Sequence, residues 1–302
     1  MAKASVIPLD LNFQGHKQAI AAYGIPHADG IALVECGPAS TLPGLRSALA
    51  ALGYSLRDVT HVLVTHIHLD HAGASGHLAR EGAQVIVHPA GAPHLENPEK
   101  LLASAARIYG EAMDTLWGEF LPLPPSNLRI AQDEEEIEVG NLRFICLHTP
   151  GHAEHHMAYL FEDVCFSGDV GGVRMPNYPY LRVPMPPPEL HLERWHETIT
   201  RLQRLHFKRI APTHFGLFED VEWHLAEVDK NLSEAAGWLE RVMPGGYAIE
   251  DLRRMFTEWM NEQAQAMGLS EESIATFDLA NPLGMSADGL YRYWNKVRMA
   301  AS

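Results

Sequence analysis

The chain has 302 residues, of which 46% are apolar and 20% are charged, so it is long enough to bury a large core. This composition excludes collagen-like, coiled-coil-only and wholly disordered chains. Lysine and arginine number 23 against 38 aspartate and glutamate residues, which gives a formal net charge of −15. That sign opposes binding to phosphate backbones, so nucleic acid is not expected as a partner.

The cysteines and the hydropathy pattern indicate a cytoplasmic protein that does not enter a membrane. Cys36, Cys146 and Cys165 each lie in an apolar run, where a thiol behaves as a small buried hydrophobe, and they form no disulfide framework. The amino terminus lacks the long apolar stretch of a signal peptide. No other stretch approaches the ~18 apolar residues that a membrane span needs.

Short apolar runs typical of β-strands recur through the first two thirds of the chain, interleaved with helical patterns. The strands are expected at residues 31–34, 61–65, 84–87, 142–147 and 164–166. The helices are expected at residues 42–52, 75–81, 98–117 and 189–205. This mixture predicts an α/β or α+β domain with layered sheets.

After residue 216 the pattern is helical only, with breaks expected at residues 244–246 and 281–282. One helix carries an apolar seam with alternating spacings of four and three residues. The seam consists of Val221, Leu225, Val228, Leu232, Ala235, Leu239 and Val242. It indicates either packing inside the chain, which we favour, or a homodimer contact.

The residues with the clearest chemical signal lie at 65–71, with the sequence T-H-I-H-L-D-H. They directly follow the apolar run 62–64, so His66, His68, Asp70 and His71 are expected at the edge of a sheet. Imidazole nitrogens and carboxylate oxygens are ligands that suit zinc and its first-row neighbours. This cluster therefore predicts a metal site.

Three further candidate ligands follow apolar runs later in the chain. His152, Asp169 and His214 each lie in or beside a Gly or Pro turn after a short β-like run. This arrangement is expected if several strands deliver ligands to one edge of a sheet. His155 and His156, just beyond His152, are interpreted as structural hydrogen-bonding residues.

The order T-H-x-H-x-D-H, T-P-G-H, S-G-D and a late histidine, over about residues 5–218, resembles the metallo-β-lactamase superfamily in its glyoxalase II-like branch. The resemblance implies a four-layer αββα sandwich with metals at one edge. Residues 1–218 would form this metallo-hydrolase domain. Residues 219–302 would form a helical C-terminal extension that packs on it.

The resemblance also implies two divalent metal ions, zinc in first place, with iron or manganese as alternatives because His and Asp accept all three. It assigns one metal to His66, His68 and His152, the second to Asp70, His71 and His214, and the bridge to Asp169. Two carboxylates against two dications leave an excess of positive charge, which lowers the pKa of a bound water toward ~7.

The expected function is hydrolysis, in which a hydroxide held by the dinuclear centre attacks a small ester-like substrate such as a thioester or lactone. Asp70 is expected to handle a proton as well as to bind metal. The alternatives are a persulfide dioxygenase-like oxidoreductase with one iron, and a phosphodiesterase or β-lactamase. A metal-stabilised binding protein is disfavoured, because structural zinc sites do not normally use a bridged pair of metals.

The segment 174–188 is too rich in proline for regular structure and starts close to Asp169. Arg174, Tyr178, Tyr180 and Arg182 are therefore candidates for contact with a small-molecule substrate. The alternative is that this segment is a rigid connector.

Overall fold

The structure, a computed structural model, describes residues 5–176 and 178–299. The chain divides into two compact units. The first comprises Met1–His148 and His155–Gly168, and the second comprises Thr149–Glu154 and Asp169–Ser302. Asp169 and His214 therefore lie in the same unit as the helices that follow residue 218.

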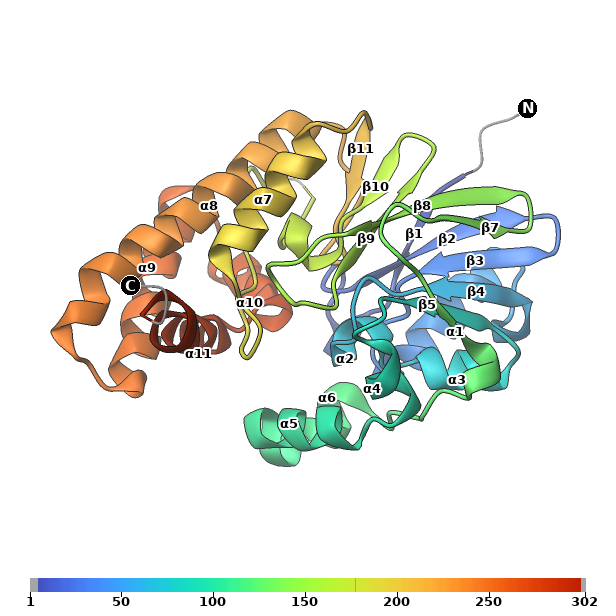
Figure 1. Cartoon of the computed structure of the whole chain (residues 1–302), viewed down its shortest axis with the longest axis horizontal. Helices are drawn as coiled ribbons and strands as arrows, with labels where there is room; N and C mark the ends of the chain where they lie inside the picture. Colours follow the sequence, from blue (N-terminus) through green and yellow to red (C-terminus); the bar gives the residue numbers. More distant parts are fainter. Residues whose placement is uncertain (1–4, 177, 300–302) are drawn as a thin grey trace. The chain divides into compact units, whose positions relative to one another are not determined.

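The first unit contains a six-stranded mixed sheet in the order β1-β2-β3-β4-β5-β6 (Figure 1). Its strands are β1 (Ile7–Asp10), β2 (Ala21–His27), β3 (Gly30–Val34), β4 (Val59–Leu63), β5 (Gln84–Val87) and β6 (Leu128–Ile130). The pairs β1–β2 and β2–β3 are antiparallel, and the pairs from β3 to β6 are parallel. Parallel neighbours require crossover connections. These include the helices α1 (Leu42–Ala51), α2 (Leu69–Ala72) and α3 (Ser75–Arg80).

A second, antiparallel set of strands in this unit has the order β10-β9-β8-β7. Its strands are β7 (Glu136–Val139), β8 (Leu142–His148), β9 (Met157–Phe161) and β10 (Val164–Phe166). Two hydrogen bonds join β9 to the end of β4: the Tyr159 hydroxyl donates to the Val64 carbonyl at 2.8 Å, and the Met157 amide donates to the Thr65 carbonyl at 2.7 Å. The loop that follows β4 is therefore held by both sheets.

The helix expected at residues 98–117 is not continuous, and that prediction was wrong. The structure has α5 (Glu99–Tyr109) and α6 (Met113–Trp117) over these residues, and α4 (Ala92–Glu96) precedes them. Gly110 adopts a φ of 52°, a positive value that ends α5 and that glycine accepts without strain. The apolar spacing continues across this break, so the periodicity alone could not reveal it.

The second unit is mainly helical after residue 190. It contains α7 (Leu192–Gln203), β11 (Arg209–Ala211), α8 (Val221–Val242), α9 (Ile249–Ala266), α10 (Glu271–Ala280) and α11 (Leu283–Tyr293). In Figure 1, α7 runs beside α8 and α9 lies beside α11, as their contacts confirm. The breaks expected at residues 244–246 and 281–282 are confirmed.

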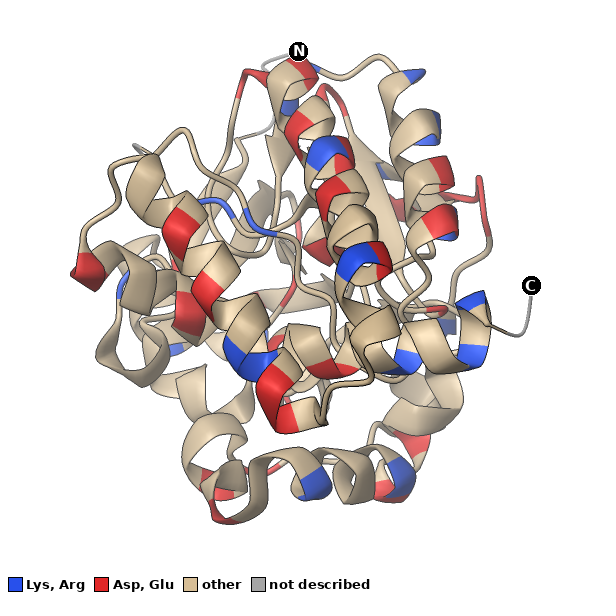
Figure 2. Ribbon diagram, turned by 90° about the vertical axis from the view of Figure 1, so that its left-hand side faces the viewer, with Lys and Arg blue, Asp and Glu red and all other residues tan. Residues whose placement is uncertain are grey.

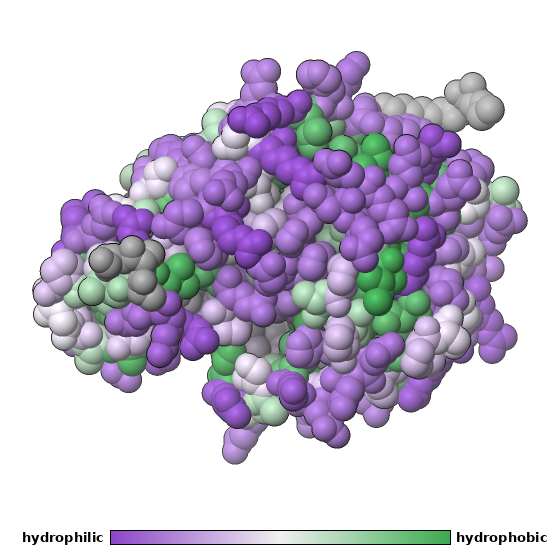
Figure 3. Space-filling view, in the orientation of Figure 1, coloured by the Kyte–Doolittle hydropathy of each residue, from purple (hydrophilic) through white to green (hydrophobic). Residues whose placement is uncertain are grey.

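Several charged side chains on the helices form ion pairs of opposite sign. Figure 2 shows acidic and basic positions interspersed along them, as in the pair between Arg253 of α9 and Asp288 of α11. Hydrophilic side chains predominate on the face shown in Figure 3. No helix within residues 5–176 and 178–299 is both long and apolar enough to cross a bilayer. The expected α/β class with a helical C-terminal region is confirmed.

The apolar seam of α8 is covered by helices of its own unit. Leu225, Val228, Leu232, Ala235 and Leu239 are buried, and α8 contacts α7, whose Ile199 and Leu202 are also buried. Packing inside the chain therefore accounts for the seam.

Replacing Leu232 by alanine is expected to lower the free energy of unfolding by about 2–5 kcal/mol, because a fully buried leucine leaves a cavity when truncated. Urea unfolding measures this loss. Lys230→Ala, an exposed change on the same helix, should shift the value by less than about 0.5 kcal/mol. Equal effects of the two changes would contradict the packing described here.

Candidate metal centre

The first unit brings His66 and His68 together where the chain leaves β4. The Thr65 hydroxyl donates to the Glu35 carboxylate, so its oxygen accepts from Nδ1 of His66 at 3.0 Å. His66 therefore carries its proton on Nδ1 and its lone pair on Nε2. The Nε2 atom of His66 lies 2.8 Å from Nδ1 of His68. Two ring nitrogens that converge in this way are typical of two ligands of one cation.

Asp70 and His71 follow on α2, which begins one residue after His68. The backbone therefore changes from extended to helical inside the motif, so its second half faces a different direction from its first. His71 Nδ1 donates to Glu35 Oε1 at 2.9 Å, and His71 Nε2 lies 3.6 Å from Asp70 Oδ2. This pair therefore offers a nitrogen and an oxygen ligand side by side.

Glu35 is the functional residue that sequence reasoning missed. Its side chain is 1% exposed, and its carboxylate accepts from the Thr65 hydroxyl, the Thr65 amide and His71 Nδ1. It thereby orients the rings of both His66 and His71, as carboxylates behind metal-binding histidines commonly do. The available signal was an acidic residue placed directly after the apolar strand 31–34.

His155 and His156 lie against the same cluster in the first unit. The ring of His155 lies 5.6 Å from that of His68 and 6.0 Å from that of His66, between centroids. The ring of His156 lies 5.0 Å from that of His66. The two imidazoles therefore help to pack the rings of the predicted ligands.

The second unit brings together His152, Asp169 and His214. Nε2 of His152 lies 3.3 Å from Asp169 Oδ2, and Nε2 of His214 lies 3.5 Å from Asp169 Oδ1. Each oxygen of one buried carboxylate therefore faces a different imidazole. This is the arrangement that a bridging carboxylate between two cations requires.

The turn that carries Asp169 is held by two side chains from helices of its unit. Trp195 of α7 donates from its indole nitrogen to the Val170 carbonyl at 3.0 Å. His224 of α8 donates from Nε2 to the Gly171 carbonyl at 2.7 Å, and its Nδ1 lies 3.2 Å from an Arg174 nitrogen that donates to it. Burial lowers the pKa of His224 to about 4, so the ring is neutral at pH 7.

Arg174, a predicted substrate contact, is engaged with the C-terminal region. Its guanidinium donates to both carboxylate oxygens of Asp220 at 2.7 Å and lies 4.0 Å above the Phe218 ring. The hydrogen bonds from Arg174 lower the pKa of the Asp220 carboxyl. The charge of Arg174 is thus already matched within its own unit.

The other three predicted substrate contacts also reach the C-terminal helices. Arg182 is fully buried and donates to Asp278 of α10 and, at 3.0 Å, to the Tyr180 hydroxyl. The Tyr178 hydroxyl lies 2.6 Å from Ser273 Oγ of α10. These contacts are those expected of a firmly anchored connector, and a direct contact of these side chains with substrate stays a prediction.

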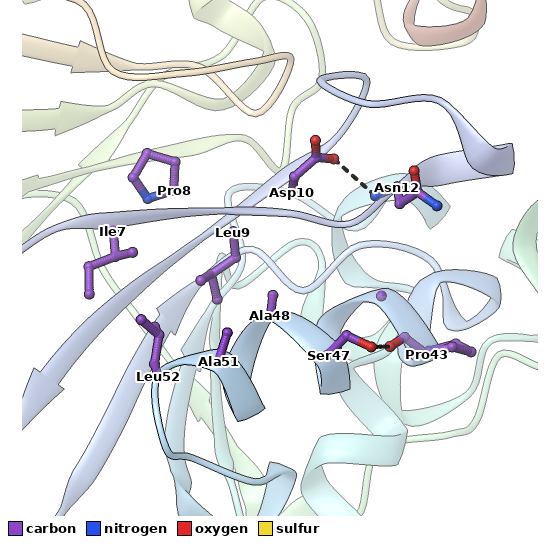
Figure 4. Close-up of a pocket in the computed structure, with 11 residues that line it drawn as sticks. Ile7, Pro8, Leu9, Asp10, Asn12, Pro43, Ser47, Ala48, Ala51 and Leu52 are labelled. Atoms are coloured by element: carbon purple, nitrogen blue, oxygen red, sulfur yellow. Dashed lines mark hydrogen bonds between the residues drawn. The ribbon is translucent and has the colours of Figure 1, made fainter.

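An open groove of about 670 Å³ lies between β1 and α1 (Figure 4), and its lining includes none of the candidate ligands. Its lining is mainly apolar and includes Leu9, Ala48 and Leu52. Its one acidic side chain, Asp10, accepts hydrogen bonds from the amides of Asn12 and Gln18, both at 3.0 Å. Asp10 is therefore committed to the local turn, and the groove brings no set of catalytic groups together.

Comparison with known proteins identifies a family for most of the chain. The model of the Metallo-beta-lactamase superfamily matches residues 19–214, a range that contains all seven predicted ligands. The chain is 28% identical over 204 residues to the metallo-beta-lactamase fold-containing protein ST1585 of Sulfurisphaera tokodaii. That match covers 65% of this chain and 77% of the relative.

Two shorter matches involve enzymes with named activities. The chain is 33% identical over 125 residues to hydroxyacylglutathione hydrolase of Rhodopseudomonas palustris, which covers 41% of this chain and 37% of the relative. It is 28% identical over 114 residues to an N-acyl homoserine lactonase of a Bacillus species, which covers 38% of this chain and 37% of the relative. The chain thus matches little more than a third of either enzyme.

A solved structure shows the same fold over nearly the whole chain. The metallo-beta-lactamase family protein TTHA1429 of Thermus thermophilus superposes with a TM-score of 0.65 at 22% identity. The superposition covers 98% of this chain and 94% of that protein. The fold likeness therefore extends beyond the range of the family model and into the C-terminal helices.

His224 is expected to make the stability of the chain depend on pH between 6.5 and 4. Because its folded pKa is about 4 against an ordinary 6.5, the unfolded chain takes up the proton first as the pH falls. The contribution of the neutral His224 ring to the free energy of unfolding is fully present above pH 6.5. It is lost as the pH falls toward 4, and the loss is roughly 3 kcal/mol at most. His224→Gln should remove it, as urea unfolding at pH 7, 5.5 and 4 would show.

The exposed His206→Gln serves as the control, and it should follow the wild-type dependence. If His224→Gln also followed the wild-type dependence, the ring would not be held neutral in the fold.

Proposed function

The chain belongs to the metallo-beta-lactamase superfamily and is a hydrolase, and we propose that its substrate is a small ester-like molecule, namely a thioester, a lactone or a related carboxyl derivative. One observation supports the dependence on metal: the two carboxylate oxygens of Asp169 face different imidazoles, those of His152 and His214. The named activities of the hydroxyacylglutathione hydrolase and the lactonase support the substrate class.

The donor set fits divalent cations. In the first unit His66 and His68 present converging nitrogens, and His71 stands beside the Asp70 carboxylate. Five imidazoles and two carboxylates are borderline ligands, which suit zinc best and also accept iron or manganese. We propose that the two ligand groups together hold two ions: His66, His68 and His152 at one, Asp70, His71 and His214 at the other, and Asp169 at both.

When bound, such cations polarise a carbonyl oxygen and lower the pKa of water. The side chains of the chain have separate tasks around that chemistry. Glu35 and Thr65 hold the rings of His66 and His71 in one tautomer, so that their Nε2 lone pairs stay available. The Asp70 side chain is 21% exposed while that of His71 is fully buried, so Asp70 is the accessible carboxylate that we propose accepts the proton released in hydrolysis.

Metal analysis combined with ligand substitution tests this proposal. The purified chain is expected to carry two zinc-like ions and to hydrolyse a thioester or lactone in preference to a β-lactam or phosphodiester. His68→Ala and Asp169→Ala should lose bound metal and at least about 100-fold in kcat/KM, because removing a ligand costs more than removing the group behind it. The exposed His206→Ala is the matched control and should retain both.

Three outcomes would contradict the proposal. Full metal content and rate in both variants would remove these residues from the site. One iron per chain with thiol-dependent oxygen uptake would favour the dioxygenase alternative. A clear preference for the phosphodiester or β-lactam would overturn the substrate class.

A further inference from the structure

His152 is held at its second ring nitrogen by the proline-rich segment. Nδ1 of His152 lies 2.9 Å from the carbonyl oxygen of Pro184, and both residues are buried. A carbonyl can only accept, so Nδ1 must carry the proton. This leaves the lone pair on Nε2, the nitrogen that lies 3.3 Å from Asp169. The position of one backbone carbonyl therefore sets the tautomer and the direction of a predicted ligand.

Pro184 is held in turn by the junction of α10 and α11. On one side, Asn281 Nδ2 donates to the Val183 carbonyl at 3.4 Å. On the other side, the Met185 amide donates to Ser286 Oγ at 3.2 Å. The Ser286 hydroxyl donates to Asn281 Oδ1 at 2.9 Å, which joins the two contacts. Both side chains are buried, so these bonds are shielded from water.

A glycine lets α11 approach this segment closely. A Cβ at Gly289 would lie 1.9 Å from the Met185 carbonyl oxygen and 2.8 Å from the Pro186 carbonyl carbon. Both are backbone atoms, which cannot rotate away as a side chain can, so any larger residue must displace the segment. Gly284, in the first turn of the same helix, has open space instead, because its Cβ would meet no atom closer than 3.9 Å.

We propose that Asn281, Ser286 and Gly289, which we call the α11 clamp, are positioning residues that set the orientation of His152 through the Pro184 carbonyl, and that the C-terminal helices thereby control cation affinity. This inference rests on the proposed metal centre. It assigns a task to α11, a helix that lies outside the range matched by the superfamily model. The clamp acts through the backbone, so its residues need no contact with cation or substrate.

Gly289→Ala tests the proposal, with Gly284→Ala as the matched control. Alanine favours a helix interior over glycine, so both changes suit the helix itself and only the first displaces Met185. Gly289→Ala is expected to bind Zn²⁺ about 10–100-fold more weakly in competition with a chelator, the range found when a group behind a ligand is lost. It should also change the visible absorption of the Co²⁺-substituted chain. Gly284→Ala should match the wild type in both measurements.

Ser286→Ala is the second variant, because it removes the hydrogen bond to Met185 without adding volume and keeps the test valid if Gly289→Ala does not fold. It should weaken Zn²⁺ binding in the same direction. Wild-type affinity and Co²⁺ absorption in a folded Gly289→Ala chain, or in Ser286→Ala where Gly289→Ala does not fold, would overturn the proposal.

The tautomer of His152 in the metal-free chain separates this inference from the proposed function. ¹⁵N spectra of the imidazoles should show His152 protonated at Nδ1 in the wild type and in Gly284→Ala, and a mixture of tautomers in Gly289→Ala. If the wild type bound no cation, the proposed metal centre would be wrong. The tautomer measurement would still show whether the α11 clamp orients His152, because it needs no bound metal. An unchanged tautomer in Gly289→Ala would overturn the inference.

Discussion

A buried imidazole directs a fixed lone pair at a cation when its other nitrogen donates to an acceptor, and three such hydrogen bonds organise the candidate site. His66 donates to Thr65, His71 donates to Glu35, and His152 donates to the Pro184 carbonyl. Each acceptor is itself held by hydrogen bonds: Thr65 and Glu35 bond to each other, and Asn281 and Ser286 hold the residues on either side of Pro184. Without these acceptors the rings could rotate or exchange tautomers, and the lone pairs would not stay directed at one point.

The part of the site that could be predicted from sequence is the part encoded locally. His66, His68, Asp70 and His71 occupy one short motif after an apolar run, and Asp169 follows the strand expected at 164–166, which the structure confirms as β10. The bounds predicted for the strands at 84–87 and 164–166 match those observed. Each of these apolar runs is followed directly by a polar residue, His88 or Ser167, which marks its end in the sequence. The mixed α/β class followed from the alternation of such segments.

The rest depends on contacts between residues far apart in the chain. Glu35 is one of 38 acidic residues, and its place after the apolar run 31–34 does not reveal that it contacts Thr65 and His71 from the neighbouring strand. The acceptor for His152 is a backbone carbonyl, which no side-chain pattern can reveal. Arg182 was predicted as a substrate contact from its place in a proline-rich segment, but its partner Asp278 lies 96 residues away in α10.

The most direct test of this account is anomalous X-ray scattering at the zinc edge from crystals of the zinc-loaded chain. The account predicts two zinc positions. One is bonded to nitrogens of His66, His68 and His152, the other is bonded to Asp70, His71 and His214, and Asp169 contacts both. Zinc bound only to the histidines of the first unit, or only to those of the second, would contradict the account. The absence of zinc from all of these histidines would also contradict it.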